Sequence, residues 1–172
     1  MRASLRFTFA VPLLASALVG AALAQLPAAI DAPGEAPVLK LHAAGAQVYE
    51  CKAGADGKLA WAFREPVATL MLDGNTIGRH YRGPTFEHMD GGAVVIKPVA
   101  SMPSPDGTSI PWLKAEVVDK RGTGVLSEVT TVQRINTQGG ALQGPCEQAG
   151  AVQGSAYSAD YVFLRKGDDA RR

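Results

Sequence analysis

The side chains best suited to chemistry lie in one short polar segment, between residues 80 and 90. It contains two imidazoles, His80 and His88, and two carboxylates, Glu87 and Asp90. Neutral imidazole nitrogen and carboxylate oxygen both bind divalent cations such as Zn²⁺, so His80, His88 and Asp90 are candidate metal ligands. The spacing matches no known zinc motif, and the Gly83-Pro84 step leaves the relative direction of the two histidines open. We expect a solvated hairpin or loop, with a metal site as the alternative.

The same segment is the best candidate for acid–base catalysis. A hydrolase centred on His80, Glu87, His88 and Asp90 would use the two carboxylates on either side of a glycosidic bond. Acidic residues beside an Asp-Gly turn are also common for reasons of turn geometry alone. The sequence has no GxSxG motif and no glycine-rich loop leading into a helix. We therefore expect a non-catalytic protein without a cofactor, with the hydrolase as the alternative.

A second group of side chains is suited to binding. Trp112 follows Pro111 at the end of a proline-rich segment, where an aromatic ring could stack on a sugar, line a pocket or anchor the loop to the core. Arg134 could bind an anionic ligand or pair with a carboxylate of the protein. The candidate binding residues are His80, Tyr81, Arg82, Glu87, His88, Trp112 and Arg134.

The N-terminal residues have the layout of an export signal. Arg2 and Arg6 precede an uncharged, apolar run over residues 7–24 that ends in the triplet Ala22-Leu23-Ala24. A basic start, an apolar stretch and a small-residue end are typical of a cleaved signal peptide over residues 1–24; a retained anchor is the alternative. We expect a periplasmic or secreted protein with no membrane span after processing.

The charge balance argues against nucleic-acid binding. The chain has 17 Lys and Arg against 16 Asp and Glu, and the first 24 residues hold two of the basic residues and none of the acidic ones. The processed chain is therefore nearly neutral, with no general attraction for phosphate backbones. Its partner is expected to be a small molecule, a glycan or an envelope protein.

The two cysteines, Cys51 and Cys146, both lie in the exported part of the chain. In an oxidising compartment a single pair is most simply a disulfide; two free thiols or a shared metal site are the alternatives. There is no CxxC spacing, so thiol–disulfide catalysis has no support.

The elements that must position these residues are strands. Short stretches with two-residue alternation recur between Gly- and Asp-containing turns, and no stretch after the signal has sustained helical periodicity. The pattern predicts an all-β fold of about nine short antiparallel strands, either a β-sandwich or a small β-barrel. The expected layout is an extended leader over 25–37, one β domain over 38–164, with a crossover loop at Pro98–Pro111, and a flexible charged tail over 165–172. The expected strands are Val38–Leu41, Gln47–Lys52, Ala60–Glu65, Val67–Leu72, Thr76–Tyr81, Ala93–Lys97, Leu113–Asp119, Val125–Ile135 and Tyr157–Leu164.

With these segments in view, the chain resembles a family of exported bacterial and fungal proteins catalogued as domain of unknown function 3455. The resemblance spreads over most of residues 38–164 and implies a secreted single domain with paired cysteines. Phe86 stands where many relatives are expected to carry Trp. The matching segments are Gln47-Val48-Tyr49-Glu50-Cys51, Trp61-Ala62-Phe63, residues 80–87, 101–105 and 110–113, Gln133-Arg134-Ile135-Asn136 with the following Thr-Gln-Gly-Gly, and Tyr157-Ser158-Ala159-Asp160-Tyr161.

The function expected from the sequence is an exported β-domain that binds a small molecule, a glycan or an envelope partner through its loops, because loops on a rigid sheet are the usual place for such sites. The alternatives are the hydrolase described above and a structural component of the envelope.

Overall fold

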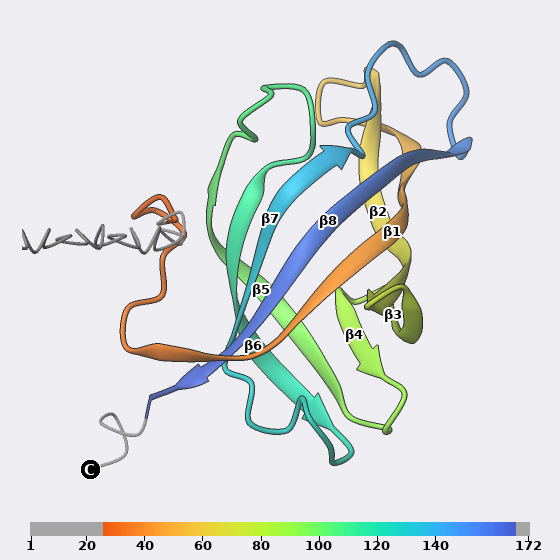
Figure 1. Ribbon diagram of the computed structural model, residues 1–172. Helices are drawn as coiled ribbons and strands as arrows, with labels where there is room; N and C mark the ends of the chain where they lie inside the picture. Colours follow the sequence, from red (N-terminus) through yellow and green to blue (C-terminus); the bar gives the residue numbers. More distant parts are fainter. Residues whose placement is uncertain (1–25, 168–172) are drawn as a thin grey trace, which may run out of the picture.

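In the computed structural model, which describes residues 26–167, the protein folds as a closed antiparallel β-barrel. Each strand pairs with the next along the chain, and the last strand pairs with the first (Figure 1). No helix occurs among the described residues. The eight strands are β1 (Glu35–Ala53), β2 (Leu59–Leu72), β3 (Asn75–Tyr81), β4 (Thr85–His88), β5 (Ala93–Met102), β6 (Trp112–Arg121), β7 (Thr131–Gly139) and β8 (Val152–Lys166).

Alternation within the strands separates the inside of the barrel from its surface. In β8, for example, Tyr157, Ala159, Tyr161 and Phe163 are buried, while the residues between them are partly exposed. Side chains on successive strand residues point to opposite faces, so this alternation directs one set into the barrel. Closing the sheet leaves no open edge among the described strands, which is how an all-β domain of this size avoids pairing with other chains.

The apolar core fills one end of the barrel. The ring of Phe86 packs edge-on against Tyr161 and Phe163, with centroid distances of 4.7 and 5.3 Å. Leu126 and Val129, from the loop between β6 and β7, are completely buried in the same cluster and close this end. The other end carries the β1–β2, β3–β4, β5–β6 and β7–β8 connections, and we call it the mouth.

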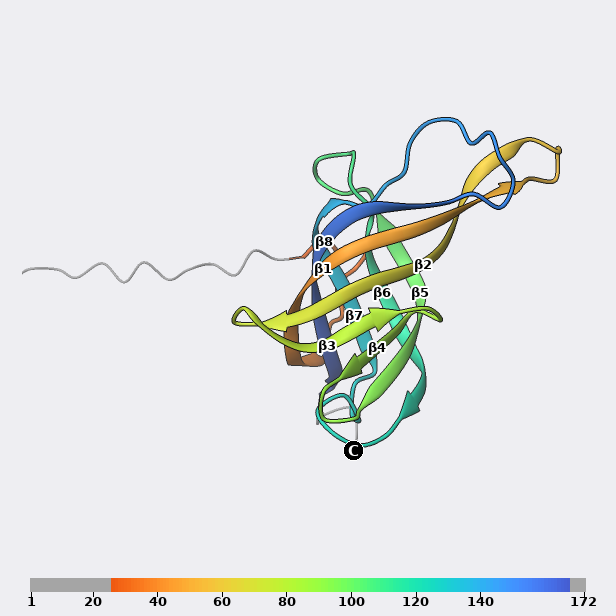
Figure 2. The same cartoon turned by 90° about the vertical axis from the view of Figure 1, so that its right-hand side faces the viewer.

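The β1–β2 hairpin extends beyond the barrel wall at the mouth (Figure 2). Pairing between β2 and β3 begins only at Ala68, whereas pairing between β1 and β2 continues to Ala53 and Leu59. Pro66 therefore lies where β2 has no strand paired with it on the β3 side. Proline lacks a backbone N–H, and at this position the β2–β3 ladder does not need one. A bulge at Val48/Tyr49 re-aims β1 at the same level.

The sequence predicted the all-β fold, and the structure selects the barrel over the sandwich. The first two predicted strands form one continuous β1, and the next two form β2. The short β4 was not predicted, because its four residues lie in a segment read as polar loop. The prediction of a strand from Val125 was wrong at its start: β7 begins at Thr131, and residues 125–130 instead close the end of the barrel.

The proline-rich segment was also predicted too broadly as loop. β5 continues through Pro98 to Met102, with a bulge between Pro98 and Ala100. A bulge removes one residue from the ladder, so a proline is tolerated there. The remaining loop, 103–111, joins two neighbouring strands and is not a crossover.

The segment before β1 is docked on the barrel wall. Ile30 is fully buried, its carbonyl accepts a hydrogen bond from Gln133 Nε2 at 2.6 Å, and Lys114 Nζ donates to Asp31 O at 2.8 Å. The predicted extended leader thus contains a turn that covers the outer face of β6 and β7. At the other end of the chain, Arg165 and Lys166 belong to β8 and pair with Ala36 and Glu35.

Two predicted segments fall outside the described residues: the signal peptide over 1–24 and the end of the charged tail, 168–172. Among residues 26–167 no helix combines the length and the apolar character needed to cross a bilayer.

Close packing between β1 and β2 makes Gly45 a sensitive position. A Cβ at this residue would overlap the carbonyl oxygen of Val67 and the backbone of Ala68. Because those atoms are held by the ladder, we expect Gly45→Ala to lower the free energy of unfolding by about 2–3 kcal/mol. Gly154→Ala in β8 is the matched control, since its Cβ would meet only Ala46 Cβ at an ordinary 3.5 Å. Urea unfolding of both variants tests this, and equal stabilities would contradict it.

Candidate functional site

A cavity of about 290 Å³ lies inside the mouth of the barrel. Its walls are mostly apolar and come from seven strands and two connecting loops, so the barrel as a whole shapes it. The volume is near the lower end of the range for small-molecule pockets, which usually combine apolar walls with a few polar groups. The lining residues are Gln47, Tyr49, Phe63, Pro66, His80, Pro84, Ile96, Pro98, Ile110, Pro111, Leu113, Arg134 and Tyr161.

Arg134 provides the positive charge of the cavity. On β7 it pairs with Leu113 of β6 and Tyr161 of β8, two buried residues of the cavity wall. Its Nε and Nη2 atoms donate to the carbonyl of Pro111 at 3.0 and 2.8 Å. This pair of bonds fixes the plane of the guanidinium and leaves further N–H groups available.

His80 is the buried imidazole of the cavity wall. Only 4% of the residue is exposed, and its ring stacks on Phe86 with the centroids 3.8 Å apart. Nδ1 lies 2.9 Å from the carbonyl oxygen of Thr85, which can only accept a hydrogen bond. Nδ1 therefore carries the proton, and Nε2 is left as an acceptor. Burial, with the nearby charge of Arg134, lowers the pKa of His80 to about 3, so the ring is neutral at physiological pH.

Several buried polar atoms near the cavity make no well-formed hydrogen bond within the described part of the chain, although Gln47, Tyr157, Tyr161 and Arg134 lie close to one another. These atoms include Gln47 Nε2 and the hydroxyls of Tyr157 and Tyr161. Gln47 and Tyr161 line the cavity, and the two residues are 3% and 1% exposed. Burial raises the pKa of both tyrosines, which keeps their hydroxyls protonated and able to donate. Unpaired buried donors are costly, and a bound molecule or water in the cavity would satisfy them.

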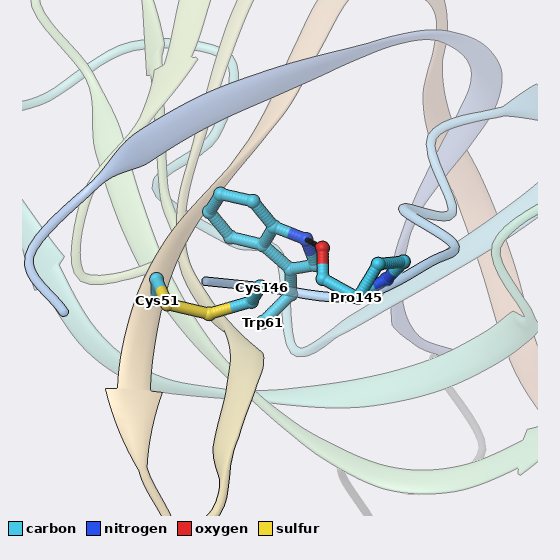
Figure 3. The surroundings of a disulfide bond; sticks show 4 residues. All are labelled: Cys51, Trp61, Pro145 and Cys146. Atoms are coloured by element: carbon cyan, nitrogen blue, oxygen red, sulfur yellow. Dashed lines mark hydrogen bonds between the residues drawn. A yellow bond between two sulfur atoms is a disulfide. The ribbon is translucent and has the colours of Figure 1, made fainter. Parts of the chain in front are cut away.

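The rim of the mouth is tied together by the disulfide. Cys51, near the end of β1, is bonded to Cys146 in the loop between β7 and β8, with the Cα atoms 5.8 Å apart. Beside it, Trp61 Nε1 donates to Pro145 O at 3.2 Å (Figure 3). Tyr49 connects this rim to the cavity, because it lines the cavity and its hydroxyl donates to Gly140 O at 2.8 Å. The predicted disulfide is confirmed.

The structure separates the members of the polar cluster predicted to act together. Glu87 receives hydrogen bonds from Tyr81 at 2.7 Å and from Arg79 at 3.0 Å, which lower its pKa. His88 and Asp90 form a pair at 3.1 Å in the turn before β5. His80 alone of the four lines the cavity. Among residues 26–167 no three His, Cys, Asp or Glu side chains are grouped as a metal site requires.

Asp90 has a role within the fold. Its carboxylate accepts hydrogen bonds from the backbone N–H of Val125 at 2.8 Å and of Gly92 at 2.9 Å, and these lower its pKa to about 2. It thereby joins the β4–β5 turn to the loop that closes the barrel. Arg82, another candidate, is exposed in the turn between β3 and β4 and does not line the cavity.

Trp112 lies outside the cavity. It begins β6 and lines a shallow surface hollow together with Asp106 and Thr137. Its Nε1 is buried and has no hydrogen-bond partner among the described residues. Of the seven predicted binding residues, His80 and Arg134 are therefore the two that reach the cavity.

Sequence reasoning missed most of the cavity wall. Gln47 was not singled out, although it interrupts the inward-facing apolar residues of its strand, and a polar side chain at an inward position signals a functional interior. Tyr49 and Tyr161 were assigned to the core. Three of the wall prolines, Pro66, Pro84 and Pro98, gave no signal of their own, because the closure of the barrel is what brings them together.

Comparison with known proteins gives one assignment. The family model described as a protein of unknown function, DUF3455, matches residues 32–74 and 71–165. No curated protein and no solved structure shows significant similarity. The matched segments contain all the cavity-lining residues and both cysteines. The chain is a member of the DUF3455 family.

Proposed function

We propose that this protein is an exported, non-catalytic binding protein that holds one small, largely apolar molecule in the mouth of its barrel. The observation that carries the proposal is the cavity of about 290 Å³, whose mostly apolar wall includes a few polar side chains: Gln47, His80, Arg134 and the tyrosines. A flat surface for a glycan or a protein partner would not need a concave volume of this kind. The disulfide is consistent with an oxidising compartment, which supports export.

The character of the polar groups favours binding over acid–base catalysis. The lining residues include no Asp or Glu. The imidazole of His80, with a pKa of about 3, is a weak base at neutral pH, whereas an effective general base has a pKa near the working pH. The groups facing the cavity can donate and accept hydrogen bonds, which is sufficient to orient a ligand.

Filling the cavity tests this function. Cinnamyl alcohol, a neutral aromatic molecule, is the probe, and isothermal titration calorimetry measures its affinity. Leu113→Trp replaces a wall side chain by a bulkier indole that occupies part of the cavity. We expect it to weaken binding at least about ten-fold. Val118→Trp, on the exposed face of the same strand, is the control and should bind like the wild type.

Failure of the wild type to bind cinnamyl alcohol and its charged analogues cinnamate and cinnamylamine at millimolar concentration would refute the proposed function, as would normal binding by Leu113→Trp. Thermal unfolding of both variants verifies that they are folded under the conditions of the titration.

A further inference from the structure

We infer that the cavity selects a small carboxylic acid, a monoanion with an apolar or aromatic body, and that Arg134 receives its carboxylate. The inference rests on the proposed function, because it names the chemical class of the ligand held in the same cavity.

The first step concerns the charge of Arg134. No ion pair joins its guanidinium to a carboxylate among residues 26–167, and the residues that line the cavity include no other Lys or Arg and no acid. By contrast, Arg79 is paired with Glu87 and Arg64 with Glu65 on the surface of the barrel. Arg134 is half-buried in the cavity wall, so its guanidinium keeps part of its hydration and can form a charge-assisted pair with an anion in the cavity. In this cavity the described protein groups leave that anion to the ligand.

The second step concerns the direction of the guanidinium. Its bonds to Pro111 O use Nε and Nη2 and hold the group against the loop between β5 and β6. A guanidinium has five N–H donors in a fixed plane, so donors remain for a carboxylate. The field of Arg134 extends across the cavity, since the same charge acts on Tyr49, His80, Tyr157 and Tyr161.

The third step concerns the neighbouring polar groups. Gln47 Nε2 and the Tyr161 hydroxyl are buried donors without a well-formed hydrogen bond, and both residues line the cavity with Arg134, which lies close to Tyr161. Additional donors around one cation suit an acceptor with several lone pairs, as a carboxylate has. A single arginine balances a single negative charge, which argues for a carboxylate over a phosphate dianion.

The fourth step concerns the rest of the cavity wall. Phe63, Ile96, Leu113 and the wall prolines present apolar surface to the same space. Phe63 is 53% exposed at the rim and packs edge-on against Tyr49, a position from which its ring can contact an entering molecule. The ligand therefore combines a charged head with an apolar body.

Three molecules with one body and different heads test the inference. Cinnamate, cinnamyl alcohol and cinnamylamine carry a negative, a neutral and a positive head on the same aromatic frame, and calorimetry gives the affinity of each. We expect cinnamate to bind at least about ten-fold more tightly than the alcohol, and the amine to bind most weakly.

Substitution of the arginine identifies the group responsible. Arg134→Gln keeps an N–H donor for Pro111 O but removes the charge, so it should abolish the preference for cinnamate over the alcohol. Arg134→Lys should retain part of the preference, because the charge remains while the planar fork is lost. Arg64→Gln removes one positive charge from the projecting hairpin at the same end of the barrel and should leave the preference intact.

The outcomes separate the two proposals. Equal binding of cinnamate and the alcohol by the wild type would overturn the inference and leave the proposed function standing. A preference for cinnamate that survives in Arg134→Gln would overturn the role of Arg134. Failure of all three molecules to bind the wild type would overturn both.

Discussion

Loss of the Cys51–Cys146 disulfide is expected to lower the free energy of unfolding by about 4 kcal/mol. The bond joins residues 95 positions apart, and cross-linking so long a segment removes much of the conformational freedom of the unfolded chain. Both sulfurs are buried, so Cys51→Ala/Cys146→Ala is the appropriate variant. Urea unfolding of the wild type and the double variant measures the difference.

Reduction provides the control for this prediction. Dithiothreitol should destabilise the wild type by a similar amount and leave the double variant unchanged. A loss below about 1 kcal/mol would show that the other contacts of the rim, including Trp61 Nε1 to Pro145 O, hold the loop without the bond. The double variant should also bind cinnamyl alcohol more weakly, because Tyr49 and Gly140 connect the tied loop to the cavity.

The second large effect is a loss of stability at acidic pH that is caused by His80. His80 has a pKa of about 3 in the folded protein, against about 6.5 in the unfolded chain. Between these values the unfolded state binds a proton that the folded state does not, so stability falls as the pH falls. From pH 7.5 to 4.5 this group alone should remove about 2.5 kcal/mol from the free energy of unfolding.

Urea titrations at several pH values compare the wild type with His80→Phe, whose ring can still stack on Phe86. We expect a clearly smaller slope between pH 4.5 and 6.5 in the variant, whatever its stability at pH 7.5. His42→Gln is the control, since His42 is an exposed histidine paired with Asp160 at 3.0 Å. The window ends at pH 4.5 because, below it, carboxylates such as Asp90, whose pKa is lowered to about 2 in the folded protein, take up protons in the unfolded chain and also reduce stability. Identical slopes for wild type and His80→Phe would contradict the prediction.

The fold was predictable to the extent that it depends on local pattern. Two-residue alternation and Gly-containing turns identified the strands, and two cysteines in an otherwise ordinary chain identified the disulfide. The choice between sandwich and barrel was not accessible, because it depends on β1 pairing with both β2 and β8, which are far apart in the chain. Residues 125–130, with the buried Leu126 and Val129, were predicted to be part of a strand. Buried apolar residues that close the end of a barrel have no periodic signature that would identify them.

The candidate site was only partly predictable for a related reason. His80 and His88 are both polar and close in sequence, and the pattern could not show that one faces the interior while the other pairs with Asp90 outside. Their positions differ by an even number of residues, but the β3–β4 turn lies between them. Arg134 was identified as a candidate anion-binding residue, yet its inward direction follows from the register of β6, β7 and β8.

The two ends of the barrel differ in what they expose. β8 terminates at Lys166 beside the start of β1, at the end opposite the mouth (Figure 1). A protein tethered to a sensor chip through its C-terminus would therefore present the opening to the flowing solution. Under the proposed function, a bound molecule would exchange through this mouth, whose rim is cross-linked by the disulfide.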